Sequence, residues 1–186
     1  MGVCRDHLNA LYADTADPWN FAQSDYEQAK FAATRAALSR RRYASAFELG
    51  CGNGQLARHI AALCDTYTGM DAVAIALKTA QHAVPQARFL QGFYPCALPR
   101  DGFDLLILSE ILYFLDRAAL RRLAGDIAAS WPRAEVICVT YLGETGHELQ
   151  GREALEIFTA ALETHVFEPV TRAEGYRIDR GLPEGA

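Results

Sequence analysis

A glycine-rich stretch, FELGCGNGQ at residues 47–55, has the residue types and spacing that point most clearly to ligand binding. It stands where an apolar run that predicts a strand passes into a run that predicts a helix. Glycines at such a junction permit a tight turn and let a ligand approach the backbone, while the helix start offers unpaired N–H groups. Gln55 stands where a dinucleotide-binding GxGxxG sequence has its third glycine, which argues against NAD or FAD.

A carboxylate, Asp71, stands at the end of the next predicted strand. Because parallel strands end at the same edge of a sheet, we expect Asp71 near the glycine-rich loop, where it can accept hydrogen bonds from both hydroxyls of a ribose. An Asp here can also cap the helix that begins at Ala72. The nearby glycines favour ribose binding.

The elements that position these residues follow a βα rhythm from residue 44 onward, which is typical of an α/β fold with a mostly parallel sheet. The predicted strands lie at 44–49, 66–70, 88–91, 103–108 and 135–141, and the predicted helices at 54–64, 72–84, 117–130 and 152–163. Two alternating runs within residues 165–180, around Glu174 and Gly175, predict an antiparallel hairpin.

Residues 1–43 precede this core and predict a helical cap, with a helix over residues 24–38 that Ser24 begins. The chain has no repeat, linker or low-complexity tract. We therefore expect a single domain over residues 1–186, in which the cap is followed by a ligand-binding core at 44–186.

Aromatic and basic side chains of the cap have two interpretations each. Trp19, Phe21 and Tyr26 either cover a ligand or hold the cap helix to the core, and ligand contact is favoured for Tyr26. Lys30 and Arg35 can reach a carboxylate of a ligand, but their spacing favours a solvated helix face.

Composition narrows the class of protein. The 186 residues carry 18 Lys and Arg against 23 Asp and Glu, a net charge of −5 that disfavours nucleic-acid partners. Five cysteines without a CxxC pair predict neither a disulfide framework nor a metal site, and hence a reducing compartment. With no signal-peptide pattern and charges inside the most apolar run, 103–115, we expect a cytoplasmic protein without membrane contact. The oligomeric state is not predicted.

The block Glu48-x-Gly50-x-Gly52-x-Gly54, followed by Asp71 and the terminal hairpin, resembles the class I S-adenosylmethionine (SAM) dependent methyltransferases. This resemblance implies a Rossmann-like, doubly wound sheet of seven strands with an antiparallel last strand, here with N-terminal added helices. It also implies SAM as the cofactor and S-adenosylhomocysteine (SAH) as its product.

The same resemblance assigns roles around the cofactor. It places the glycines at the aminoacyl end of SAM and Asp71 on the ribose, with Gly92 and Phe93 at the adenine and Met70 or Phe93 packed on its ring. Many family members have an acidic residue where Phe93 stands, so the adenine amino group must find another partner here. The expected cofactor-binding residues are Trp19, Tyr26, Glu48, Gly50, Gly52, Gly54, Met70, Asp71, Gly92, Phe93 and Ser109.

A narrower resemblance, to the NodS-like methyltransferases, covers nearly the whole chain. It rests on DPWxF at 17–21, SxYExxK at 24–30, SEILYFL at 109–115 and the pair GH at 146–147. Rhizobial members N-methylate the free amine of a deacetylated chitooligosaccharide. The resemblance therefore implies a small-molecule acceptor, foremost an amine nitrogen of an amino sugar or oligosaccharide.

Methyl transfer from a sulfonium requires positioning of the reactants and no nucleophilic Ser or Cys. An amine acceptor must be unprotonated when it attacks, so a carboxylate or His nearby can take its proton. The predicted catalytic residues are Glu110, which follows the fourth predicted strand, Tyr113, one turn later, and His147, which follows the fifth strand. Their alternatives are a helix-terminal charge, half-buried packing and a solvated loop, respectively.

Two other functions stay open at this point. A methyltransferase of the same fold can act on a hydroxyl of a secondary metabolite. A SAM-binding module without catalysis can serve as a partner or sensor. An NAD-dependent reductase is more distant, because the glycine spacing disfavours it.

Overall fold

Seven strands form one sheet in the computed structural model, which describes residues 8, 10, 12, 15, 17, 18, 20, 21 and 23–185. They are β1 (Tyr43–Leu49), β2 (Cys64–Asp71), β3 (Arg88–Gln91), β4 (Leu105–Ser109), β5 (Glu135–Tyr141), β6 (His165–Arg172) and β7 (Tyr176–Pro183). The order across the sheet is β3-β2-β1-β4-β5-β7-β6, and β7 runs antiparallel to both of its neighbours. The predicted seven-stranded sheet with an antiparallel last strand is confirmed.

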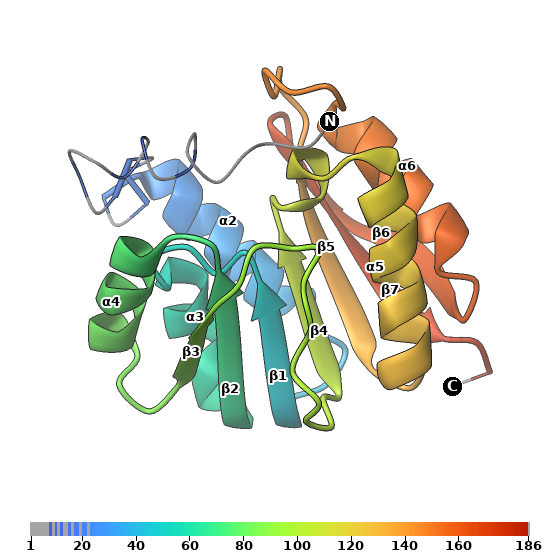
Figure 1. The fold of residues 1–186 in the computed structure, drawn as a ribbon, viewed down its shortest axis with the longest axis horizontal. Coiled ribbons are helices and arrows are strands. Elements are labelled where there is room, and N and C mark those ends of the chain that lie inside the picture. The colour runs from blue at the N-terminus through green and yellow to red at the C-terminus, as the bar shows by residue number, and fades with distance from the viewer. Residues whose placement is uncertain are drawn as a thin grey trace.

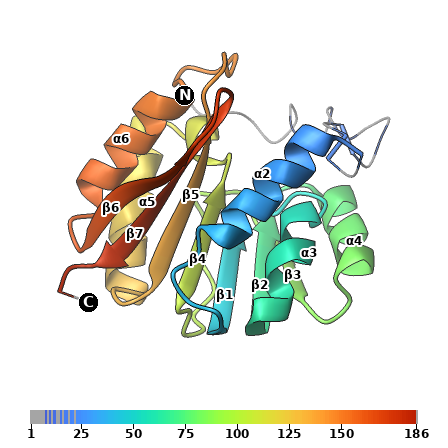
Figure 2. The ribbon, with the colours of Figure 1, turned by 180° about the vertical axis from the view of Figure 1, so that it is seen from behind.

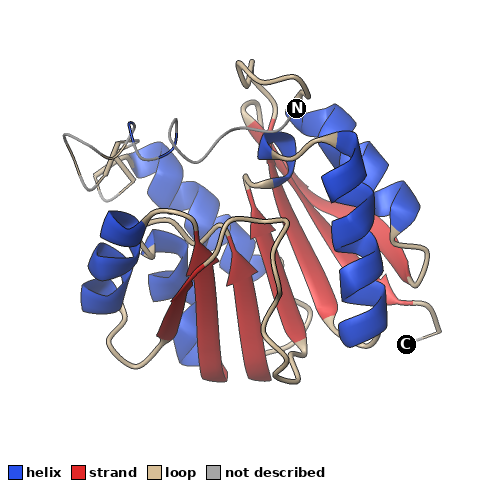
Figure 3. Cartoon of the chain, in the orientation of Figure 1, coloured by secondary structure: helices blue, strands red, loops and turns tan. Residues whose placement is uncertain are grey.

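Helices cover both faces of this sheet. They are α2 (Asp25–Ala36), α3 (Gln55–Ile60), α4 (Ala74–Ala83), α5 (Arg117–Ser130) and α6 (Gly151–Ala161). The first three lie on one face, as Figure 2 shows, and α5 and α6 lie on the other (Figure 1). Figure 3 shows the sheet between the two helical layers, which is the doubly wound arrangement.

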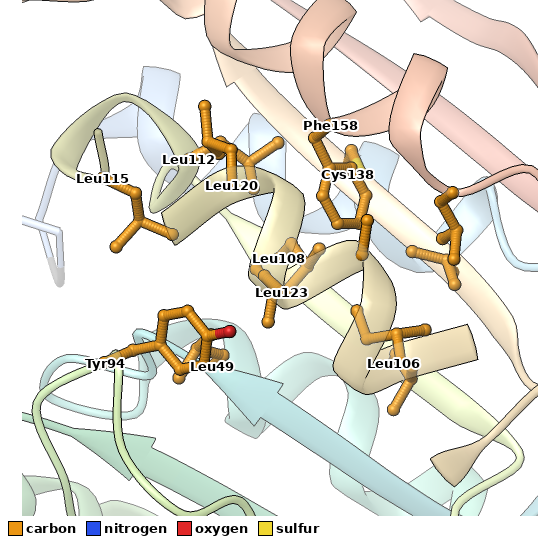
Figure 4. Packing of buried hydrophobic residues seen from close by; sticks show 14 of the residues in the cluster. Leu49, Tyr94, Leu106, Leu108, Leu112, Leu115, Leu120, Leu123, Cys138 and Phe158 are labelled. Carbon is orange, nitrogen blue, oxygen red and sulfur yellow. The ribbon is translucent and has the colours of Figure 1, made fainter. Parts of the chain in front are cut away.

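The centre of the sheet is apolar on both sides. β1, β4 and β5 read as nearly continuous buried runs, as strands under two helical layers must. On one side, Leu106 and Leu108 pack with Leu120 and Leu123 of α5 and with Phe158 of α6 (Figure 4). Each such side chain contributes about 1.5–3 kcal/mol by leaving water.

Side-chain caps set the start of two helices. Ser24 Oγ accepts a hydrogen bond from the Glu27 N–H at 3.3 Å, so Ser24 caps α2 as the sequence predicts. Asp116 does the same for α5, accepting from the Ala119 N–H at 2.9 Å.

The strand order reverses between β1 and β4, because β1 leads outward to β2 and β4 leads outward to β5. A crevice opens outside the carboxyl ends of two such strands, and doubly wound folds bind their ligands there. The glycine-rich loop follows β1 and Glu110 follows β4. The topology therefore places both candidate groups at one crevice.

Several element boundaries differ from the prediction. The helix predicted over 54–64 ends as α3 at Ile60, continues as a 3₁₀ turn at Ala61–Leu63, and β2 accordingly begins at Cys64 instead of 66. The α4 helix begins at Ala74 instead of 72, because the Asp71 carboxylate binds the Val73 N–H just before it. Other shifts affect the starts of β1, α2, α3, β4 and α6 and the ends of α2, β2, α4, β4 and α6, while β3, β5 and α5 occupy the predicted residues.

The cap helix α2 packs against the core through Phe31, which joins the buried cluster that contains Leu56 and Ile60 of α3. The division into a cap at 1–43 and a core at 44–186 stays a prediction. No helix in the described part of the chain is long and apolar enough to cross a membrane.

Gly54→Ala is expected to destabilise the protein, because Gly54 has a φ of +78° and an added Cβ would lie 2.8 Å from the Ala80 Cα of α4. The left-handed backbone alone costs a residue other than glycine about 1–2 kcal/mol. Gly125→Ala in α5 is the matched control, since a Cβ there meets nothing within 4 Å and alanine favours a helix. Urea unfolding should show a loss for the first variant and a neutral or stabilising effect for the second. Equal stabilities would contradict the close approach of α3 to α4.

Candidate active site

A cavity of about 850 Å³ lies at the crevice between the carboxyl ends of β1 and β4. Its walls come from the glycine-rich loop, the ends of β2 and β3, the turn after β4, the loop after β5 and the cap. The predicted site residues that line it are Tyr26, Glu48, Gly50, Gly52, Met70, Asp71, Gly92, Phe93, Ser109, Glu110, Tyr113 and His147. The fold thus gathers into one cavity residues that lie far apart in the sequence.

The glycine-rich loop turns sharply over the end of β2. Gly50 and Gly52 have φ values of +80° and +50°, a region that glycine adopts without strain. The N–H groups of Gly50 and Cys51 both donate to the Met70 carbonyl, at 2.8 and 3.1 Å. This arrangement fixes the loop on the edge of the sheet.

The Asp71 carboxylate braces the loop from below. Its Oδ2 accepts from the Gly52 N–H at 2.9 Å and its Oδ1 accepts from the Val73 N–H at 3.0 Å. Burial raises the pKa of Asp71, and these N–H donors oppose that shift. Each carboxylate oxygen can accept a further hydrogen bond, so Asp71 both supports the loop and stays available to a ligand's hydroxyls.

Glu48 lies beneath the loop and is 1% exposed. Burial raises its pKa to about 7, although the Tyr67 hydroxyl donates to Glu48 Oε2 at 2.6 Å. The charge of the nearby Asp71 contributes to this rise of the pKa. Glu48 therefore carries a partial charge at neutral pH in a part of the cavity that a cationic ligand group would favour.

An apolar end of the cavity adjoins Asp71. A Cβ at Gly92 would lie 2.6 Å from the Met70 Sδ, so glycine lets the β3 end approach Met70 closely. Tyr12, only 3% exposed, packs with Ala72 and Val73, and Phe93 packs against the same cluster. This part of the cavity offers flat apolar surface of the kind an aromatic base needs.

Glu110 lies directly after β4, across β1 from the strand that carries Asp71, and lines the other side of the cavity. Its φ is +53°, uncommon for a residue other than glycine, and its N–H donates to the Val139 carbonyl at 2.8 Å. The following Ile111 side chain fits against Gly50, where a Cβ would lie 3.0 Å from the Ile111 Cδ1. The backbone that carries Glu110 is thereby fitted to the glycine-rich loop.

Lys30 of α2 lies between two carboxylates at this end. It is 1% exposed, with its Nζ 2.6 Å from Glu110 Oε2 and 2.9 Å from Glu27 Oε2. Burial lowers the pKa of Lys30, but Glu110 and Glu27 outweigh burial and raise it above its ordinary value. The prediction of a solvated helix face is wrong for Lys30, which turns toward the sheet edge, and Arg35 is exposed as predicted.

Aromatic rings form the rest of this end. The His147 ring stacks on the Tyr113 ring at 5.9 Å and 19°, and lies 4.6 Å from the Phe114 ring. Burial raises the pKa of Tyr113, and the charges of Glu110 and Glu27 raise it further, so its phenol stays neutral. His147 thus joins the wall of the cavity through Tyr113 and Phe114 instead of standing as a solvated loop residue.

Three other predictions have different outcomes. Gly54 does not line the cavity, and its lack of a side chain serves the packing of α3 against Ala80. Trp19 lies outside the described residues. Phe21 packs on Phe31 and the 44% exposed Tyr26 packs on Tyr176, as the interpretation of a cap held to the core requires. Both side chains also line the cavity, and their contact with a ligand stays a prediction.

Some lining residues were missed from the sequence. Glu27 is three positions before Lys30, a helical spacing that predicts an ion pair. The spacing does not predict which way this pair faces, toward the cavity or toward solvent. Tyr12 stands in a stretch without predicted structure, and Glu144 in a polar loop, so neither carried a signal. Asp116 stands at the N-cap of α5, and that structural role gave no reason to expect it at a ligand site.

Glu48→Gln is expected to stabilise the fold at pH 8. A folded-state pKa of about 7, against an ordinary value of 4.5, means that ionising Glu48 costs the folded protein up to about 3 kcal/mol as the pH rises through this window. Glutamine stays neutral and still accepts from the Tyr67 hydroxyl. Urea unfolding of both proteins should give free energies that converge below pH 4 and diverge between pH 5 and 8. Parallel curves would contradict the raised pKa.

Comparison with solved structures agrees with this architecture. The N-methyltransferase NodS from Bradyrhizobium japonicum, solved in complex with SAH, superposes with a TM-score of 0.83 at 19% sequence identity. The match covers 97% of this chain and 98% of that one. The two proteins share a fold over nearly their whole length.

Comparison of sequences identifies the family to which the chain is related. Nodulation protein S from Bradyrhizobium diazoefficiens is 30% identical over 123 residues, which are 60% of this chain and 58% of that protein. Nodulation protein S from Sinorhizobium fredii is 26% identical over 150 residues, 78% of this chain and 64% of that protein. The chain spans less than two thirds of the length of these two relatives. The model of the family described as nodulation protein S (NodS) matches residues 5–129, and the chain therefore belongs to the NodS family.

Proposed function

We propose that the protein is a methyltransferase that moves the methyl group of SAM to a small-molecule acceptor, with an amine nitrogen as the accepting atom. One observation carries the proposal. The loop braced by Asp71 and the carboxylate of Glu110 face one cavity from the ends of β1, β2 and β4. Cofactor and acceptor sites on opposite sides of one cavity are what an in-line transfer needs.

The residues present fit SAM. Asp71 would accept hydrogen bonds from the ribose hydroxyls, and Met70 with Phe93 would pack on the adenine. Glu48 and the loop at Gly50 and Gly52 would hold the aminoacyl end, where a partly ionised carboxylate suits an ammonium group. Gly92, Ser109 and Tyr26 line the same cavity and complete the proposed cofactor-binding set.

SAM supplies, when bound, a methyl group on a sulfonium that needs no further activation. The protein's own residues have three tasks. The cap residues Tyr12 and Tyr26 help to close the cavity against water, and Tyr113 with His147 forms a wall beside the acceptor. Glu110 accepts the proton of the acceptor's ammonium group, which leaves the nitrogen with the lone pair it needs to attack.

The charge of the cavity supports an amine over a hydroxyl acceptor. The described residues that line the cavity include no Lys or Arg. They include six carboxylates, those of Glu27, Glu48, Asp71, Glu110, Asp116 and Glu144. Such a lining attracts a cation, whereas a neutral hydroxyl gains nothing from it and an anionic acceptor is repelled.

The aromatic wall supports a ring-bearing acceptor. Tyr113, Phe114 and His147 present flat surfaces next to Glu110, a combination that suits the face of a sugar whose amine reaches the carboxylate. The family resemblance points the same way, to an amino sugar or an oligosaccharide that carries one.

Asp71→Asn is expected to weaken SAM binding by about tenfold or more, because it removes the charge that accepts both the loop N–H groups and the ribose hydroxyls. Asp65→Asn, at the exposed start of the same strand, is the matched control and should bind SAM as the wild type does. Isothermal titration calorimetry with SAM and SAH measures both. Absence of saturable binding to the wild type would refute the proposed function.

Glu110→Gln is expected to lower kcat for amine methylation at least tenfold while the SAM dissociation constant changes by less than about threefold, because Gln cannot accept the proton. The probe is a chitotetraose with one free amine, assayed with methyl-labelled SAM at pH 6 to 9. Fully N-acetylated chitotetraose is the control acceptor and should take no label. Labelling of hydroxyls in the control would favour an O-methyltransferase instead.

A further inference from the structure

We infer that Lys30 is a positioning residue, which holds the Glu110 carboxylate in place and in its ionised form from outside the cavity. This inference rests on the proposed function, in which Glu110 accepts the acceptor's proton. From the sequence we expected Lys30 on a solvated helix face or in contact with the SAM carboxylate. Neither expectation matches its burial between Glu27 and Glu110.

The contacts of Lys30 are directed at the site without being part of its surface. Its Nζ lies 2.6 Å from Glu110 Oε2, 3.1 Å from Glu27 Oε1 and 5.4 Å from the centre of the Tyr26 ring. Glu27, Glu110 and Tyr26 all line the cavity, whereas Lys30 does not. Lys30 is therefore placed to act on a ligand through its neighbours.

Stability alone is a weak reason for this arrangement. A buried ion pair loses the hydration of both charges, and apolar residues of similar size often stabilise a protein as well or better. Lys30 is among the largest fully buried side chains, on a helix whose neighbouring Phe31 already packs in the core. A charge kept at this cost suits a role at the adjoining cavity.

Lys30 restrains the part of Glu110 that the backbone leaves free. The bond from the Glu110 N–H to the Val139 carbonyl and the fit of Ile111 against Gly50 fix the backbone relative to the glycine-rich loop. Only the side-chain torsions remain to be set. The charge-assisted bond from Lys30 sets them, as a catalytic carboxylate requires for a defined approach to its proton.

Lys30 also opposes the other influences on the charge of Glu110. Burial is the largest influence and keeps the pKa of Glu110 above its ordinary value, the charge of Glu27 adds to that rise, and Lys30 opposes it. The titratable groups next to Glu110 in the described part of the chain are Tyr26, Glu27 and Lys30 from α2 and Tyr113 from the turn after β4. Farther around the cavity lie Tyr12, Glu48, Cys51, Asp71, Tyr94, Asp116, Tyr141, Glu144 and His147. Lys30 is the one Lys or Arg among them.

The cluster of Glu27, Lys30 and Glu110 retains one negative charge when all three are ionised. An acceptor that arrives as an ammonium ion would neutralise it, and transfer of a proton to Glu110 would then leave a neutral amine beside a neutral cluster. Glu27 has its own part in this balance, because it prevents Lys30 from cancelling the charge of Glu110 outright.

The test is the titration of the Glu110 carboxyl, followed by NMR in protein labelled with ¹³C at the glutamate carboxyl and assigned with Glu110→Gln. Lys30→Met should raise the midpoint by about one pH unit or more, since a neighbouring opposite charge lowers a carboxyl pKa by about 1–3 units. Lys30→Arg should restore a midpoint near that of the wild type. Arg35→Met, on the exposed side of the same helix, is the matched control and should leave it unchanged.

An equal midpoint in wild type and Lys30→Met would overturn the inference. If Lys30→Met does not fold, Glu27→Gln replaces it, because removal of the competing carboxylate should lower the Glu110 midpoint, and an unchanged midpoint would overturn the inference in that case too. The NMR readout does not need an acceptor, so it separates this inference from the proposed function, which calorimetry with SAM tests on the same samples.

Kinetics with the chitotetraose amine give a second readout. The rate of the wild type should fall as the pH drops through the Glu110 midpoint, because the protonated carboxyl cannot accept a proton. Lys30→Met should move this acidic limb upward by the shift that NMR measures, and lower kcat with little change in the SAM dissociation constant. A lower kcat with an unmoved acidic limb would reduce Lys30 to a structural role and contradict the inference.

Discussion

Negative charge buried at the carboxyl edge of the sheet is the constraint around which this structure is arranged. Three carboxylates lie at or beside the carboxyl ends of strands: Glu48 one residue before the end of β1, Asp71 at the end of β2 and Glu110 directly after β4. The charge of each has a different hydrogen-bond donor. Tyr67 donates to Glu48, backbone N–H groups donate to Asp71, and the ammonium group of Lys30 contacts Glu110. Burial raises the pKa of all three carboxylates, and in each case the named donor opposes that rise.

The α2 helix supplies the positive charge that one of these buried carboxylates needs. Without α2, Glu110 would lose its cation, and the cavity would lose part of its wall. The α2 helix also packs in the core through Phe31, so the charge and the apolar contacts come from one element. The α2 helix is thus joined to the sheet at the point where the proposed chemistry takes place.

Much of the fold follows from the sequence, because buried parallel strands and amphipathic helices have distinct periods. The run at residues 135–141 and the helix at 117–130 occupy the predicted residues. The glycine-rich loop and Asp71 also lie where predicted, since topology brings parallel strand ends together. Local pattern could not reveal that Gly54 serves α4, or that Lys30 pairs with a residue 80 positions away, because both depend on how helices dock.

A crystal structure of the protein with SAH would test the central claim most directly. The account predicts SAH in the cavity between β1 and β4, with its ribose hydroxyls on Asp71, its amino group toward Glu48 and its sulfur facing the side where Lys30 holds Glu110. SAH bound outside this cavity, or with its ribose away from Asp71, would contradict it.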